Sequence, residues 1–236
     1  RNAAREPEIT DLVAFLRGMG AEIEGEDTAT LVINGVSEFA ASHYSVMPDR
    51  IEAGTFLVAA AATRGCIMVE NAYAEHLGIV LEKLRDAGVD VTVEGNTITA
   101  DMTKGQLTSV DLITAPYPGF PTDMQAQFTA LNVVAKGVGR ITETIFENRL
   151  MQAHEMSRMG ADITVDGHSV IIRGKSSIDG APVMASDLRA SASLVIAGLA
   201  AKGETHVDRI YHIDRGYERI EEKLQAVGAD IVRKSR

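Results

Sequence analysis

Phe120-Pro121-Thr122-Asp123-Met124 is the stretch that decides the fold, because it opens a helix-like run that is apolar on nearly all sides and has two further copies in the chain. A helix that is apolar all round must be buried against other elements. Each opening places an Asp directly before the helix, so we expect three helix N-termini to gather at one end of a domain. The equivalent openings are Pro48-Asp49-Arg50 and Ala185-Ser186-Asp187, and the predicted buried helices span residues 51–62, 124–135 and 188–201.

A second signature recurs in the other half of each unit. A Gly stands at positions 20, 88, 160 and 228, each time after an amphipathic run and before strand-like residues. Apolar side chains at helical spacing predict a surface helix, and a Gly in the left-handed conformation is a common way to end one. Alternating residues with a turn rich in Gly, Asp and Asn predict a β-hairpin. The predicted helices are 7–18, 74–86, 151–158 and 216–226, and the clearest hairpins are 89–99 and 163–172.

The complete unit is therefore strand, helix, strand, helix, strand, strand. This order predicts an α/β fold of pseudo-threefold repeats around buried helices, with repeats at 40–106, 107–176 and 177–236. Residues 1–39 hold only the trailing half of a unit, which indicates an incomplete N-terminal domain; a genuine N-terminal α/β extension is the alternative. The strands that flank the buried helices are predicted at 66–69, 110–115, 140–145 and 205–210.

The composition argues against several classes of protein. The net charge of −10 argues against nucleic acid as a partner, and no uninterrupted apolar run reaches the roughly 18 residues of a membrane span. The single Cys66 excludes an internal disulfide framework and is typical of a reducing cytoplasm. Its strand-like apolar context predicts a small core residue. The six His residues have no metal-ligand spacing, and no cofactor is expected.

Four long blocks of this sequence resemble the enolpyruvyl transferase family. The resemblance covers essentially the whole chain and implies that family's fold, an inside-out α/β barrel of two domains with three repeats each and buried parallel helices. It also implies that this chain is the C-terminal part of such an enzyme, and that a missing N-terminal domain carries the family's loop Cys, which Cys66 does not match. The blocks run from Phe120 to Gln127, Glu143 to Arg149, Ser186 to Ala190 and Asp208 to Glu218.

The resemblance implies a reaction as well. An enolpyruvyl group would pass from phosphoenolpyruvate to the 3′-hydroxyl of UDP-N-acetylglucosamine, with release of phosphate, at the first committed step of bacterial peptidoglycan synthesis. Such a transfer needs a base for the hydroxyl, a proton source for the vinyl carbon, and cations for phosphate and carboxylate. The sister reaction on shikimate 3-phosphate is the alternative enzyme. A non-catalytic folded fragment is the alternative of another class, and the fragment alone is expected to be inactive.

The same resemblance implies roles for individual residues. Asp123 corresponds to the general base for the sugar hydroxyl, although its position alone would make it a helix N-cap. Asp187 corresponds to a second acid near the reacting carbons, and Arg215 to the cation that grips phosphoenolpyruvate through paired hydrogen bonds. The other expected contacts are Ile145 and Phe146 with the nucleotide, Arg149 and Arg189 at the cleft, Asp49 in a structural or domain-closure role, and Glu6 and Glu8 near the cleft between domains.

Overall fold

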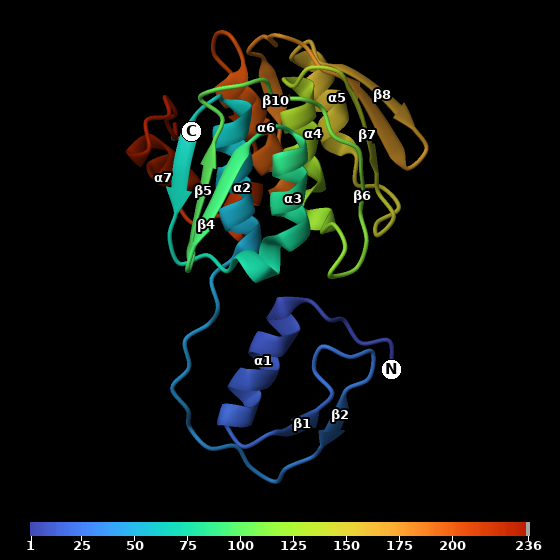
Figure 1. The fold of residues 1–236 in the computed structure, drawn as a ribbon, viewed down its shortest axis with the longest axis vertical. Helices are drawn as coiled ribbons and strands as arrows, with labels where there is room; N and C mark the ends of the chain where they lie inside the picture. The colour runs from blue at the N-terminus through green and yellow to red at the C-terminus, as the bar shows by residue number, and fades with distance from the viewer. Residues whose placement is uncertain (235–236) are drawn as a thin grey trace.

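A computed structural model describes residues 1–234 of the chain. Figure 1 shows a small N-terminal body and a larger body that holds the rest of the described chain. The small body consists of helix α1 (Pro7–Gly18) and the antiparallel hairpin of β1 (Glu22–Glu24) and β2 (Val32–Asn34). A segment without helix or strand follows and leads into the larger body. We propose that the division near residue 40 separates two structural units, as the sequence suggests.

Three helices pack against one another in the middle of the larger body. Almost every residue of these helices is buried, which confirms the expectation drawn from their all-round apolar sequence. Small residues permit the close approach: a Cβ added to Gly54 would meet the Met124 side chain at 2.9 Å. The helices are α2 (Arg50–Ala62), α4 (Gln125–Val133) and α6 (Leu188–Ala200).

Small sheets and amphipathic helices cover this helical centre (Figure 1). The first repeat has the antiparallel order β3-β5-β4, and the second has the order β6-β7-β9-β8 with β6 parallel to β7. The first repeat contains β3 (Cys66–Val69), the 3-10 helix η1 (Ala74–Leu77), α3 (Gly78–Asp86), β4 (Asp90–Glu94) and β5 (Thr97–Asp101). The second contains β6 (Leu112–Ile113), η2 (Thr122–Met124), β7 (Val138–Thr142), α5 (Met151–Arg158), β8 (Asp162–Asp166) and β9 (Ser169–Arg173).

The third repeat has a shorter sheet. Only β10 (Pro182–Met184) and β11 (His206–Asp208) pair, in parallel, and no further strand joins them among residues 1–234. The repeat continues with η3 (Ile210–Arg215) and α7 (Ile220–Ala226). No helix within the described residues is both long and apolar enough to cross a bilayer.

The predicted helix ends are largely confirmed. Gly20, Gly88, Gly160 and Gly228 all have positive φ, between 85° and 100°, directly after a helical segment. The left-handed conformation that this requires is nearly free of strain only for Gly. The sequence signature therefore marks the same local event four times.

Several predictions differ from the structure, among them the strands expected over 110–115 and 205–210, which span only Leu112–Ile113 and His206–Asp208. The helix expected from residue 216 begins only at Ile220, because Tyr217 turns into the core and Arg219 has a positive φ of 45°. The strand expected over 140–145 ends at Thr142, where the chain turns into a loop. Cys66 is exposed rather than buried, because side chains alternate along β3 and Ile67 and Val69 take the partly buried face.

Candidate active site

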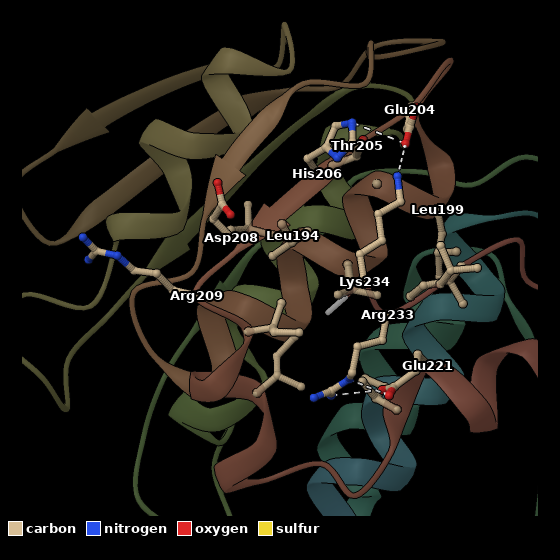
Figure 2. A pocket seen from close by; sticks show the side chains of 18 of the residues that line it. Leu194, Leu199, Glu204, Thr205, His206, Asp208, Arg209, Glu221, Arg233 and Lys234 are labelled. Atoms are coloured by element: carbon tan, nitrogen blue, oxygen red, sulfur yellow. Dashed lines mark hydrogen bonds and ion pairs between the residues drawn. The ribbon is translucent and has the colours of Figure 1, made fainter. Parts of the chain in front are cut away.

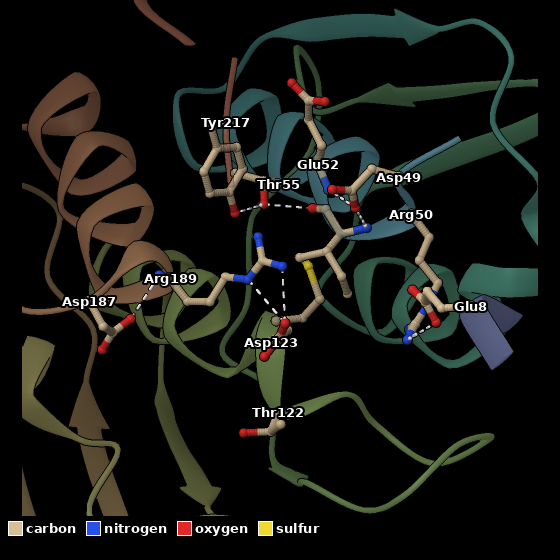
Figure 3. A network of polar contacts seen from close by, with 12 residues as sticks. Glu8, Asp49, Arg50, Glu52, Thr55, Thr122, Asp123, Asp187, Arg189 and Tyr217 are labelled. Atoms are coloured by element: carbon tan, nitrogen blue, oxygen red, sulfur yellow. Dashed lines mark hydrogen bonds and ion pairs between the residues drawn. The ribbon is translucent and has the colours of Figure 1, made fainter. Parts of the chain in front are cut away.

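The three Asp residues lie at the same end of the buried helices, as Figure 3 shows, but they do different things. Asp49 accepts hydrogen bonds from the backbone N–H groups of Ile51 and Glu52 at 2.8 and 3.0 Å. Asp187 accepts from those of Arg189 and Ala190 at 2.8 and 2.9 Å. Both are N-caps, which satisfy backbone donors that the helix leaves free.

Asp123 has no capping role. It lies inside η2, and its carboxylate faces two guanidinium groups (Figure 3 draws one of them). Arg189 donates from Nε and Nη2 to Asp123 Oδ2 at 3.1 and 3.0 Å, and Arg149 Nη1 lies 2.8 Å from Oδ1. Burial alone would raise the pKa of Asp123, but the charges of Arg189 and Arg149 outweigh it and lower that pKa below its ordinary value. The carboxylate is therefore ionised at neutral pH.

Arg189 is held on a rigid support. The residue is only 9% exposed, and its guanidinium lies 5.4 Å from the ring centre of Tyr217. The Tyr217 hydroxyl is itself fixed by hydrogen bonds with Thr55 at 2.9 Å and Gln127 at 3.3 Å. Arg189 Nη1 is buried and has no hydrogen-bond partner within the described residues. An unpaired buried donor of this kind is costly unless a ligand engages it.

The segment after β7 carries the predicted nucleotide contacts. Ile145 and Phe146 are both exposed, so their side chains are free to meet a ligand. The Arg149 guanidinium lies 4.8 Å from the Phe146 ring centre and donates from Nη1 to Thr122 Oγ1 at 2.9 Å. The loop is thus tied to the residue that precedes Asp123.

Arg215 is not brought into this cluster. It ends η3, is exposed, and its side chain makes no hydrogen bond or ion pair with any residue that the structure describes. An added Cβ at its neighbour Gly216 would meet the end of the Leu188 side chain at 2.4 Å, so Leu188 would have to move. The structure therefore leaves Arg215 as an unengaged cation on the same segment that supplies Tyr217.

The N-terminal body reaches the larger body through acidic residues. Glu8 accepts from Arg50 Nε and Nη2 at 2.9 and 3.2 Å, and Glu6 Oε1 lies 3.5 Å from the backbone nitrogen of Tyr117. Arg50 is 8% exposed and stacks at 5.8 Å from the Tyr117 ring centre. Sequence reasoning named the two acids but missed Arg50 and Tyr117. The signal for Arg50 was its place beside Asp49 at the head of α2.

Two further residues of the cluster escaped prediction as site residues. Thr122 and Glu143 both lie in the sequence blocks that carry the family resemblance, but neither drew a role. Glu143 is almost fully buried and accepts from Thr122 Oγ1 at 2.7 Å. A Glu directly after a strand that alternates between exposed and buried residues was the available signal, since a buried carboxylate needs dedicated partners.

A cavity lies in another part of the molecule. It has a volume of about 850 Å³ and is bounded by α6, β11, η3 and the segment Asp230–Lys234. Figure 2 shows its rim, where Glu204 pairs with Lys234 and Glu221 with Arg233. The cavity borders the short third sheet and includes none of the predicted site residues. Within residues 1–234 no group of three or more His, Cys, Asp or Glu side chains is arranged to hold a metal ion.

Comparisons with known proteins show which proteins this chain is similar to. The chain is 59% identical over 234 residues to UDP-N-acetylglucosamine 1-carboxyvinyltransferase of Coxiella burnetii, and 58% identical over 233 residues to the protein of the same name from Hydrogenovibrio crunogenus. These matches cover 99% of the chain but 54% and 56% of the relatives. The chain thus spans about half the length of the relatives it matches.

Solved structures share the fold. The enolpyruvyl transferase NikO from Streptomyces tendae superposes with a TM-score of 0.83 at 29% identity, covering 98% of this chain and 55% of NikO. EPSP synthase from Acinetobacter baumannii gives a TM-score of 0.70 at 20% identity, covering 93% of this chain and 54% of its own, which is evidence for the fold alone. The predicted fold class is confirmed by these neighbours. Residues 1–224 match the EPSP synthase (3-phosphoshikimate 1-carboxyvinyltransferase) family, so the chain belongs to this family of enolpyruvyl transferases.

Proposed function

We propose that this chain forms part of an enzyme that transfers the enolpyruvyl group of phosphoenolpyruvate to the 3′-hydroxyl of UDP-N-acetylglucosamine. The observation that carries the proposal is the 59% identity, over 99% of the chain, to a protein named for this activity. The cluster around Asp123 supports it, because a carboxylate between two guanidinium groups suits a reaction that joins a hydroxyl to an anion. The product would enter bacterial peptidoglycan synthesis, and the single thiol fits a cytoplasmic location.

Asp123 is the proposed group that binds and deprotonates the sugar hydroxyl. Asp123 Oδ2 already accepts two hydrogen bonds from Arg189, but Oδ1 meets only Arg149 Nη1, so the second lone pair of Oδ1 leaves room for a hydroxyl donor. The lowered pKa of Asp123 makes it a weak base. We therefore propose that the proton leaves as the hydroxyl oxygen attacks the enolpyruvyl carbon, when the hydroxyl has become acidic.

Arg189 and Arg215 are the proposed cations for the anionic substrate. The free Nη1 of Arg189 can donate to a phosphate or carboxylate oxygen. Arg215 has no competing partner within the described residues, so it can turn toward the ligand without breaking an ion pair. Asp187 is the proposed second acid, although its carboxylate already caps α6.

The nucleotide would lie against the loop 144–149. The exposed Phe146 ring offers a flat apolar surface and is stacked by Arg149, which ties nucleotide contact to the Asp123 cluster. This supports the nucleotide sugar over shikimate 3-phosphate as the acceptor. The second candidate keeps one specific observation in its favour, since the matched family is described by the shikimate reaction.

The decisive experiment uses a protein of the relatives' length that contains this chain. We expect phosphate release from phosphoenolpyruvate with UDP-N-acetylglucosamine and none with shikimate 3-phosphate; turnover with shikimate 3-phosphate alone would contradict the proposal. The isolated 236 residues are expected to release no phosphate, because the remaining half of the enzyme would supply further substrate contacts. Turnover by the isolated chain would show that the essential groups all lie within it.

A further inference from the structure

Glu143 is a buried acidic side chain of the second repeat, and both of its carboxylate oxygens accept hydrogen bonds. It follows β7 directly, is 1% exposed, and accepts four hydrogen bonds. Thr114 Oγ1 donates to Oε1 at 2.9 Å, and Thr122 Oγ1 donates to Oε2 at 2.7 Å. The backbone N–H groups of Ile145 and Phe146 donate to Oε1 at 2.7 and 3.1 Å. Hydrogen bonds to an ionised acceptor are the stronger kind in proteins.

These four bonds join three segments of the chain. Thr114 follows β6, Thr122 begins η2, and Ile145 and Phe146 belong to the loop proposed to contact the nucleotide. The connection is reinforced at Thr114, whose hydroxyl accepts from Thr144 N at 2.8 Å and whose carbonyl accepts from Thr144 Oγ1 at 2.6 Å. The loop is therefore held from its backbone, which leaves its exposed side chains free for a ligand.

A second path leads from Glu143 toward Asp123. The Thr122 hydroxyl donates to Glu143 and accepts from Arg149 Nη1 at 2.9 Å, and the same Nη1 lies 2.8 Å from Asp123 Oδ1. The Thr122 hydroxyl and the Arg149 guanidinium thus link the buried carboxylate to the proposed base. Because Glu143 fixes the direction of the Thr122 proton, it also fixes which lone pair Arg149 meets.

We propose that Glu143 is a positioning residue, which sets the nucleotide loop through Ile145 and Phe146 and sets the Arg149–Asp123 pair through Thr122. This inference rests on the proposed enolpyruvyl transfer to a nucleotide sugar. A carboxylate is required because it only accepts, and four donors converge on it. An amide in its place would point two N–H donors either at the loop backbone or at the Thr122 hydroxyl.

The test is Glu143→Gln in the full-length protein, with Glu94→Gln as the matched control. Glu94 is exposed at the end of β4, and its side chain makes no hydrogen bond or ion pair within residues 1–234. For Glu143→Gln we expect hydrogen exchange in the peptide covering 144–150 to accelerate roughly tenfold or more, the size expected from losing hydrogen bonds to a charged group. Exchange in the β8–β9 hairpin should not change, and Glu94→Gln should match the wild type throughout.

Binding and turnover measurements distinguish a positioning role from a merely structural one, because a structural role would not affect the two substrates differently. The Kd for UDP-N-acetylglucosamine, measured by calorimetry without phosphoenolpyruvate, should rise roughly tenfold in Glu143→Gln. The KM for phosphoenolpyruvate should change less than threefold, and kcat should fall. Equal losses for both substrates, with faster exchange across the whole protein, would mean that Glu143 only stabilises the core and would overturn the proposal. Unchanged exchange and an unchanged Kd would overturn it as well.

Thr122→Val distinguishes the effect of Glu143 on the loop from its effect on Arg149. This variant also tests the proposal if Glu143→Gln fails to fold. It removes the link to Arg149 and leaves the bonds from Glu143 to the loop backbone. We expect kcat to fall roughly tenfold, with exchange in 144–150 and the nucleotide Kd within twofold of the wild type. An unchanged kcat would overturn the second path. If the wild type binds UDP-N-acetylglucosamine but turns over neither acceptor, the proposed function fails, while the exchange and Kd measurements still decide whether Glu143 sets the loop.

Discussion

The head of α4 and the head of α6 occupy equivalent places in two repeats, yet their Asp residues have opposite surroundings. Asp187 points at backbone N–H groups of its own helix and serves as a cap. Asp123 points away from its helix toward Arg149 and Arg189, which come from other segments. A carboxylate that caps a helix is occupied by local structure, whereas one held by side chains can exchange partners when a ligand arrives. Equivalent positions in a repeat therefore do not imply equivalent contacts.

The largest effect is expected from Asp123→Asn in the full-length enzyme. The amide keeps the shape and one acceptor oxygen but cannot take a proton from the hydroxyl, so kcat should fall by roughly 10² to 10⁴. Steady-state phosphate release measures this, and circular dichroism should remain that of the wild type. Asp49→Asn is the matched control at the equivalent position of α2 and should retain most of the activity. Full activity in Asp123→Asn would remove Asp123 as the base.

Arg189→Met should have the next largest effect. The substitution removes two hydrogen bonds to a charged partner, so kcat/KM for phosphoenolpyruvate should fall roughly 10- to 150-fold. It also removes one of the two charges that lower the pKa of Asp123, so that pKa rises toward its ordinary value. The acid limb of the pH profile of kcat/KM should therefore move to higher pH. An acid limb that stays in place would show that another group controls it.

Removing a helix cap should have a smaller effect than removing a member of the Asp123 cluster. Asp187→Ala and Asp49→Ala should each lower the free energy of unfolding by about 1 kcal/mol, because each leaves backbone donors at a helix start unpaired. Asp187→Asn and Asp49→Asn should recover most of that loss in denaturant titrations, since Asn caps about as well as Asp. If Asp187→Asn loses more turnover than its loss of folded protein explains, the excess measures the contribution of Asp187 as the proposed second acid.

The smallest expected effect is an acid dependence of stability. The pKa of Asp123 is lower in the folded protein than in the unfolded chain, so its contribution to stability is present above the ordinary pKa of about 4 and is lost as pH falls through the folded value. Wild type should be more stable than Asp123→Asn at pH 7, and the difference should shrink below about pH 4. Chemical denaturation at several pH values measures it. A difference that grows in acid would contradict the ion pairs.

Local patterns were reliable where neighbouring residues decide the outcome. The buried helices and the left-handed Gly residues follow from side-chain period and from the cost of positive φ, both of which are properties of a short window. Tyr217 marks the limit, because it fits the apolar pattern of a helix that begins only at Ile220. Its hydroxyl bonds to Thr55, 162 positions away in the sequence, and no local pattern contains that contact.

The sequence by itself determined the repeat, the burial of three helices and the family, because each depends on residue order along the chain. Only the tertiary structure decided which groups each acidic residue contacts. Asp123 meets Arg189 across 66 positions, and Glu143 gathers donors from three segments, because packing the repeats around one centre brings these groups together. Electrostatic and hydrogen-bonding roles are set by distance in space, and that distance exists only once the helices have packed.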